Sequence, residues 1–147
     1  MHPSNRKILV NFQNGQLKTL DTRIFRWLTS FELPTETLEN KRSDIASKQA
    51  DILGSSISRS SFSPCGSFVF NGNRNGKVFV WKCDTGDLVS FYGGSKDRTG
   101  VQKQISDVVF HPHDHIIAFC SFGDDQPVVV YTFDKDLLSN NMNVRLV

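Results

Sequence analysis

Cysteine is scarce in this sequence, and its spacing excludes two common uses. Cys65, Cys83 and Cys120 form no C-x-x-C pair. Any disulfide pairing among three thiols leaves one unpaired, so the framework of a small secreted domain is not expected. Reduced thiols agree with a cytosolic or nuclear location, which we take as the expectation.

Long hydrophobic runs and a strong charge of one sign are also missing. The longest uncharged apolar run, Ile116 to Phe122, is far shorter than the roughly 20 residues that cross a bilayer. The opening residues, "MHPSNRKILV", lack the apolar core of a signal peptide. A net charge of +2 is too weak to indicate nucleic acid, and no aromatic residues for base stacking are interleaved with the basic residues Lys96, Arg98 and Lys103. We therefore expect neither a nucleic-acid partner nor an integral membrane segment.

The sequence does contain a series of short strand-like segments separated by turn residues. The predicted strands are residues 8–12, 17–21, 27–32, 56–63, 67–71, 77–83, 88–92, 106–110, 116–122 and 128–133. Asn14-Gly15 and Asn75-Gly76 lie between neighbouring segments, and Asn-Gly favours the tight turn of an antiparallel hairpin. The predicted fold class is all-β.

These strands and turns recur in one order three times. Pro3, Pro64 and Pro112 mark the same turn of each repeat. One strand position is occupied in turn by Leu20, Trp81 and Tyr131. Four-stranded repeats of about 40 to 50 residues are typical of β-propeller blades. The sequence therefore predicts antiparallel blades, with an insertion between the first and the second.

The predicted strand from Lys77 to Cys83 is apolar on both faces. Val78 and Val80 lie on one face, and Phe79 and Trp81 lie on the other. Such strands usually belong to parallel sheets, but parallel crossovers need about a dozen residues or more, and the connections here are shorter. An antiparallel sheet buried on both faces must lie between two other sheets. Radially stacked blades meet this requirement.

The expected organisation has five parts. Residues 1–33 are a partial first blade without its innermost strand, 34–55 a polar insertion loop, 56–94 a second blade, 95–104 a basic inter-blade loop, and 105–147 a third blade with a C-terminal tail. A short helix is possible at 44–53. Since propellers have about 4 to 8 blades, we expect the chain to be a fragment whose exposed sheet faces make it associate and dissolve poorly.

The segment "FSPCGSFVFNGNRNGKVFVWKCDTGDLVSFY" resembles one full blade of the WD-repeat proteins, with Trp81 at the position of the family's tryptophan. Lys82 replaces the aspartate that follows it, Asn75 stands where many blades carry aspartate, and the Gly-His pair is absent. We therefore do not expect the Asp-His-Ser-Trp hydrogen-bond network of typical blades.

A closer resemblance lies in "PCGSFVFNG", "VFVWKCDTG" and "ISDVVFHPHDHIIAFCSFGDDQPVVVY", which are similar to cilium-associated WD-repeat proteins. The resemblance implies a non-enzymatic scaffold without cofactors. It implies protein partners at the ciliary base and transition zone, where the scaffold supports cilium assembly and membrane trafficking. The remaining blades of the parent propeller would be needed for closure.

One loop is a candidate partner-binding site. Lys96, Arg98 and Lys103 crowd the link between the second and third repeats, with Asp97 as the only acid among them. Loops on a rigid scaffold carry function more often than strands do. We therefore predict partner binding by these three residues, against the alternative of a solvated charged surface.

The alternative function is a metal-binding or enzymatic module centred on the turn His111–His115. Alternating histidines would share one face of a strand as zinc ligands. Pro112 and Asp114 indicate a turn instead, and no cysteine or acid follows at a recognised ligand spacing. We expect a solvated turn without metal.

Two further motifs are weak. Gly93-Gly94-Ser95-Lys96 lacks the Gly-Lys-Ser/Thr order of a phosphate loop and leads into a strand. Cys65 lies in a tight turn, and a nucleophile there would need a base, whereas the only nearby histidines belong to another repeat's equivalent turn. No catalytic, metal-binding or cofactor-binding residue is predicted.

Overall fold

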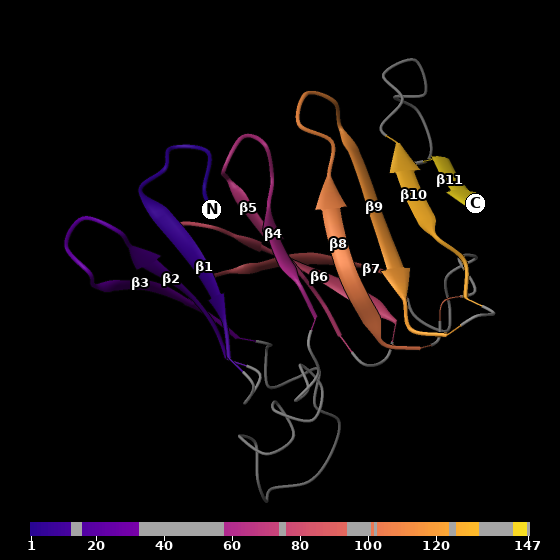
Figure 1. Cartoon of the computed structure of the whole chain (residues 1–147), viewed down its shortest axis with the longest axis horizontal. Coiled ribbons are helices and arrows are strands. Elements are labelled where there is room, and N and C mark those ends of the chain that lie inside the picture. Colours follow the sequence, from indigo (N-terminus) through magenta and orange to yellow (C-terminus); the bar gives the residue numbers. More distant parts are fainter. Residues whose placement is uncertain are drawn as a thin grey trace, which may run out of the picture.

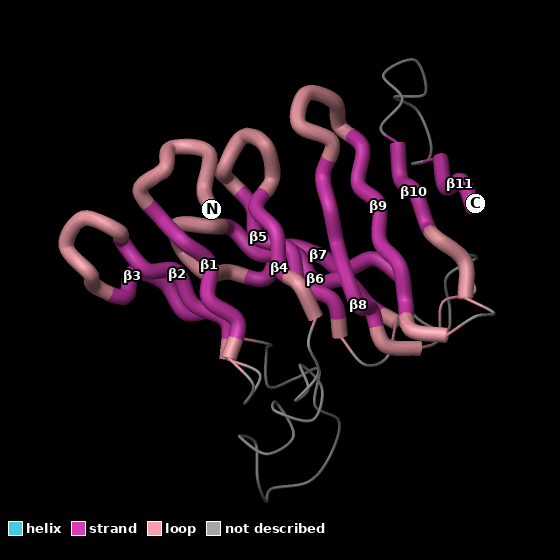
Figure 2. The backbone as a smooth tube through the Cα atoms, viewed as in Figure 1, coloured by secondary structure: helices cyan, strands magenta, loops and turns pink. Residues whose placement is uncertain are grey.

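A computed structural model describes residues 1–12, 16–32, 58–73, 76–93, 101, 103–123, 126–132 and 143–146. Within these residues every regular element is a strand (Figure 2), and no helix that could cross a membrane is present. The strands form three separate antiparallel sheets that lie side by side along the molecule (Figure 1). The all-β prediction is confirmed.

The bounds of the strands follow the chain from one sheet to the next. Sheet 1 contains β1 (Lys7–Asn11), β2 (Leu17–Asp21) and β3 (Trp27–Phe31). Sheet 2 contains β4 (Ser60–Phe62), β5 (Phe68–Gly72), β6 (Lys77–Lys82) and β7 (Leu88–Gly93). Sheet 3 contains β8 (Ile105–Phe110), β9 (Ile116–Ser121), β10 (Val129–Thr132) and β11 (Asn143–Leu146).

Each sheet is a meander in which consecutive strands pair. The same irregularity marks two of them: the register shifts beside Leu20, which pairs with Trp27, and beside Trp81, which pairs with Leu88. Strands β1 to β3 therefore correspond to β5 to β7, and sheet 1 has no counterpart of β4 among its strands. Trp81 faces Val69 across β5 and β6 as Tyr131 faces Ile117 across β9 and β10, so the predicted alignment of the repeats holds in three dimensions.

Sheet 2 is buried on both faces because successive side chains of a strand point to opposite sides. On the side of sheet 1, Phe79, Trp81 and Cys83 join a cluster with Leu17 and Phe31. On the side of sheet 3, Phe70, Val78 and Val80 join a second cluster, with side chains of sheet 3 that include Val108, Ile117, Phe119, Val129 and Tyr131. The two clusters confirm that the predicted strand with two apolar faces, residues 77–83, lies between two other sheets.

The outer faces of sheets 1 and 3 are also apolar, but the described residues leave them open. On sheet 3, Val109, Phe122 and Val128 are exposed. On sheet 1, Trp27 is 52% exposed, and the centroid of its ring lies 5.7 Å from the centroid of the Phe12 ring. Each outer face therefore has the chemistry of a blade surface without the neighbouring blade.

Some predicted details differ from the structure or lie outside the described residues. Strand β11 was not predicted, because the segment 143–146 is only four residues long and its apolar residues alternate with polar ones. The predicted strand 56–63 is shorter, since β4 begins at Ser60. The insertion 34–55 with its helix, and the turn Asn14-Gly15, lie outside the described residues. Gly76 has a φ of +72°, as the predicted Asn-Gly turn requires.

Candidate interaction surfaces

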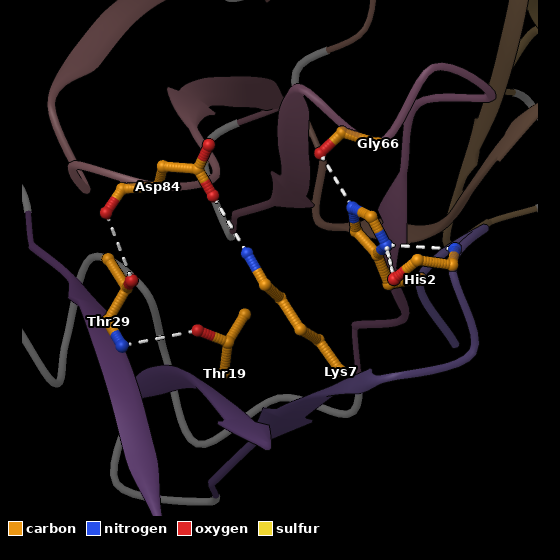
Figure 3. Close-up of polar contacts among 7 residues, drawn as sticks. His2, Lys7, Thr19, Thr29, Gly66 and Asp84 are labelled. Atoms are coloured by element: carbon orange, nitrogen blue, oxygen red, sulfur yellow. Dashed lines mark hydrogen bonds and ion pairs between the residues drawn. The ribbon is translucent and has the colours of Figure 1, made fainter. Parts of the chain in front are cut away.

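Polar contacts fasten sheet 1 to two turns of sheet 2 (Figure 3). The Lys7 ammonium donates to Asp84 Oδ1 at 2.7 Å, and the Thr29 hydroxyl donates to the Asp84 carbonyl oxygen at 3.3 Å. The His2 Nε2 atom lies 3.1 Å from the carbonyl oxygen of Gly66. These contacts come from residues far apart in the sequence, so they connect the two sheets.

The Lys7–Asp84 ion pair shifts both pKa values in the directions that favour charge. The hydrogen bond from Lys7 lowers the pKa of Asp84 below its usual 3.8, and the same bond raises the pKa of Lys7 above 10.5. The Asp84 side chain is 81% exposed, so water and salt screen most of this attraction. The ion pair therefore orients the turn more than it stabilises the fold.

We expect Asp84→Asn to lower the free energy of unfolding by less than about 1 kcal/mol at pH 7. The contribution of Asp84 is present above pH 3.8 and is lost as the pH falls through its lower folded pKa. The contribution of Lys7 is present below pH 10.5 and is lost as the pH rises through its higher folded pKa. Urea unfolding of the wild type and of Asp84→Asn should show a constant difference in the free energy of unfolding between these two pH limits. The difference should disappear in acid. A difference that grows in acid would contradict the ion pair.

Trp81 occupies the position of the family's tryptophan but makes a different hydrogen bond. Its indole Nε1–H donates to the carbonyl oxygen of Glu32 in the chain leaving β3, at 3.1 Å. The bond therefore joins sheet 2 to sheet 1. A side-chain network within one blade was not expected, because Lys82 and Asn75 replace the usual residues; Asn75 lies outside the described residues, so that expectation stays a prediction.

A cleft of about 380 Å³ lies between sheets 2 and 3. Its walls are mostly aromatic: Phe68, Phe70, Tyr92, Phe110, Ile117 and Tyr131. Turns 63–67 and 111–115, at the same end of their sheets (Figure 1), contribute its polar lining through Ser63, Cys65 and the histidine turn. The cleft has the size and apolar character of a small binding pocket.

Cys65 and two of the predicted alternative-site histidines line this one cleft. His113 and His115 come from the neighbouring repeat's equivalent turn, where the sequence analysis placed them. A hydrogen bond with the Ser63 side chain, at 3.2 Å between Oγ and Sγ, is the main cause of a lowered Cys65 pKa. That partner is a hydroxyl and not an imidazole, so the contact does not form a nucleophile–base pair.

The histidine turn is solvated, as expected. His111, His113 and His115 are all exposed, and His111 Nδ1 lies 3.0 Å from Asp114 Oδ2. Within the described ranges, no group of three His, Cys, Asp or Glu side chains is arranged to hold a metal ion. The geometry therefore gives no support to the alternative of a metal-binding or enzymatic module.

The predicted partner-binding residues fall mostly outside the described part of the chain. Lys103 is exposed just before β8. Lys96 and Arg98 lie outside the described residues, so the structure does not test whether the three residues gather. Their role in binding stays a prediction.

The other two cysteines, Cys83 and Cys120, are shielded from solvent to different degrees. Cys83 is buried in the cluster between sheets 1 and 2, and burial raises the pKa of its thiol. Cys120 is half-buried on β9, with Sγ 3.3 Å from the Ser106 hydroxyl. Neither residue lines the cleft.

The arrangement of sheets matches a known class of protein. The WD40 repeats of RRP9 superpose on 98% of this chain and 36% of that chain with a TM-score of 0.64, at 14% identity. The fold is therefore that of WD40 β-propeller blades. No protein-family model matches the chain.

The sequence itself is similar to that of jouberin. Rat jouberin is 27% identical over 134 residues, which are 91% of this chain and 11% of jouberin. Mouse jouberin is 26% identical over the same share of both chains. The similarity confirms the predicted resemblance to a WD-repeat protein, and the chain spans only about a tenth of the relatives' length.

Proposed function

We propose that this chain is part of a non-enzymatic protein-interaction scaffold, the WD-repeat region of a jouberin-like protein. It acts at the ciliary base and transition zone, where it supports cilium assembly. The observation that carries the proposal is the similarity to jouberin across 91% of the chain, on a structure made of propeller blades.

The proposed mechanism is that the packed sheets form a rigid support, which holds the binding surfaces in fixed positions for a partner. Buried clusters on both faces of sheet 2 and the polar contacts of Lys7 and Asp84 hold the sheets in fixed relative positions. Turns on such a support keep their shape when a partner arrives, which lowers the entropic cost of binding. Partner specificity then depends on the turns and links.

The location can be tested in ciliated cells with the natural full-length protein carrying a fluorescent tag. The proposal predicts a signal at the ciliary base and a reduced fraction of ciliated cells after the gene is disrupted. A uniform cytosolic signal with normal ciliation would contradict it.

The basic link supplies the proposed partner contact. Charge reversal of Lys96, Arg98 and Lys103 to glutamate in the full-length protein should weaken capture of partners identified by proximity labelling. Loss of a charged rim contact typically costs up to about tenfold in affinity through the association rate. The matched control reverses Lys41 and Arg42 in the insertion. Equal capture by the wild type and the Lys96/Arg98/Lys103 variant would remove the link from the binding surface.

The open faces of sheets 1 and 3 are proposed to be covered by the remaining blades of the parent propeller. The share of RRP9 that the chain matches supports this, because the rest of that structure lies beyond the matched part. The apolar residues on these faces are of the kind that sheets 1 and 3 bury against sheet 2.

A further inference from the structure

The turn between β2 and β3 differs in chemistry from its counterpart between β6 and β7, although the two have the same shape. In each, the amide of the last strand residue donates to a carbonyl oxygen five residues on: Asp21 to Arg26 at 2.9 Å, and Lys82 to Asp87 at 2.9 Å. Residues 22–26 thus correspond to residues 83–87. The second turn reads Asp84-Thr85-Gly86-Asp87, and the first reads Arg23-Ile24-Phe25-Arg26.

A phenylalanine stands in the first turn where the second has glycine. Gly86 has a φ of +79°, and Phe25 has a φ of +51°. The left-handed region strains a residue with a bulky side chain, and such outliers cluster at functional sites. Phe25 is also 78% exposed and Ile24 is 60% exposed, so packing among the residues that the structure describes does not explain either one.

A neighbouring blade of the observed spacing does not fit around Phe25. At the equivalent position, a Cβ atom built on Gly86 would lie 2.7 Å from the Ser30 carbonyl oxygen and 3.0 Å from Thr29 Cγ2 of the adjacent sheet. Glycine at residue 86 permits this approach. A phenylalanine at the corresponding position would collide with a blade stacked in this way, so a blade that covers the outer face of sheet 1 must stand farther from this turn.

Charge surrounds the two apolar side chains. Arg23 and Arg26 are exposed beside them, and Arg6 lies next to the turn because its carbonyl oxygen accepts the Thr22 amide at 2.9 Å. Asp21 Oδ1 accepts the amides of Arg23 at 2.8 Å and Ile24 at 3.2 Å, which holds the turn in shape. The tip therefore combines two projecting apolar residues with three arginines and one carboxylate.

We propose that this turn, residues 21–26, is a membrane-contacting tip that inserts Ile24 and Phe25 among the headgroups of an anionic bilayer. Apolar side chains that enter the interface together with basic residues that meet anionic lipids are a known basis of peripheral binding. Trp27 and Leu28 are also exposed beside the turn, and the three arginines favour an anionic surface as the occupant. The inference goes beyond the proposed scaffold role and does not depend on it.

Vesicle binding by the full chain tests the proposal, with Trp27 as an internal reporter. Trp27 is half exposed next to the turn, whereas Trp81 is buried and should not respond. We expect the protein to sediment with phosphatidylserine-containing vesicles but not with pure phosphatidylcholine, with a blue shift of tryptophan emission and weaker binding at high salt. No binding to either vesicle, or equal binding to both, would overturn the proposal.

Two variants separate the apolar and the basic parts of the tip. Ile24→Ser with Phe25→Ser should weaken vesicle binding by roughly tenfold or more. Arg23→Gln with Arg26→Gln should weaken it by roughly 25-fold, from about fivefold for each arginine. The control, Val109→Ser with Phe122→Ser, removes exposed apolar side chains from sheet 3 and should bind like the wild type. Wild-type affinity in the Ile24/Phe25 variant would overturn the proposal even if the variant binds a protein partner less well.

Phe25→Gly distinguishes a binding role from a structural one. Glycine accepts the left-handed backbone of this position, so the melting temperature should stay equal or rise while vesicle binding falls. A lower melting temperature, or unchanged vesicle binding, would show that Phe25 is not a membrane contact.

Discussion

Replacing Trp81 with alanine is expected to lower the free energy of unfolding by about 3 to 5 kcal/mol, a large part of the stability of a small domain. The Trp81 side chain is fully buried between sheets 1 and 2, against Phe31 and Phe79, with ring centroids 6.1 and 5.8 Å away. Its removal leaves a cavity and also leaves the Glu32 carbonyl oxygen without the indole donor.

Urea unfolding followed by circular dichroism measures this effect. Trp27→Ala is the matched control, because Trp27 is 52% exposed and should cost less than about 1 kcal/mol. Similar unfolding midpoints for the two variants would contradict the burial of Trp81 between sheets.

The isolated chain is expected to associate at micromolar concentrations through the open faces of sheets 1 and 3. Contiguous exposed apolar surface favours association, and Val109 and Leu20 lie on these two faces. Replacing both with lysine should raise the dissociation constant at least tenfold, because a buried unpaired charge costs about 2 kcal/mol or more.

Sedimentation velocity over a range of concentrations measures this association. The control replaces Ser90, which is exposed on the outer strand of sheet 2, with lysine and should leave association unchanged. A wild-type chain that stays monomeric and melts cooperatively would contradict association through these faces.

The sequence predicted the repeat and its stacking because both depend on local chemistry. Alternation along 77–83 and short connections were enough to place β6 between two sheets, and both of its faces are buried in the structure. The equivalence of Leu20 and Trp81 rested on turn spacing, and the shared register shift beside these residues agrees with it.

The parts that sequence reasoning missed depend on the spacing between sheets. The cleft brings Cys65 next to a histidine turn more than 40 residues away, because equivalent turns of adjacent sheets lie at the same end. No linear motif reports that proximity. The strained backbone of Phe25 could have been predicted from the sequence. The repeat alignment places Phe25 at the position of Gly86, and glycine is the residue type suited to a positive φ.

The most direct test of the account is side-chain labelling of the folded chain by hydroxyl radicals, read by mass spectrometry. Sheet 2 should be protected on both faces, so Phe79 and Trp81 on one side and Phe70 on the other should react far more slowly than exposed Phe25 and Phe122. Labelling of Phe70, or of Phe79 and Trp81, at the rate of Phe122 would show that one face of sheet 2 meets water and would contradict the stacked-blade fold.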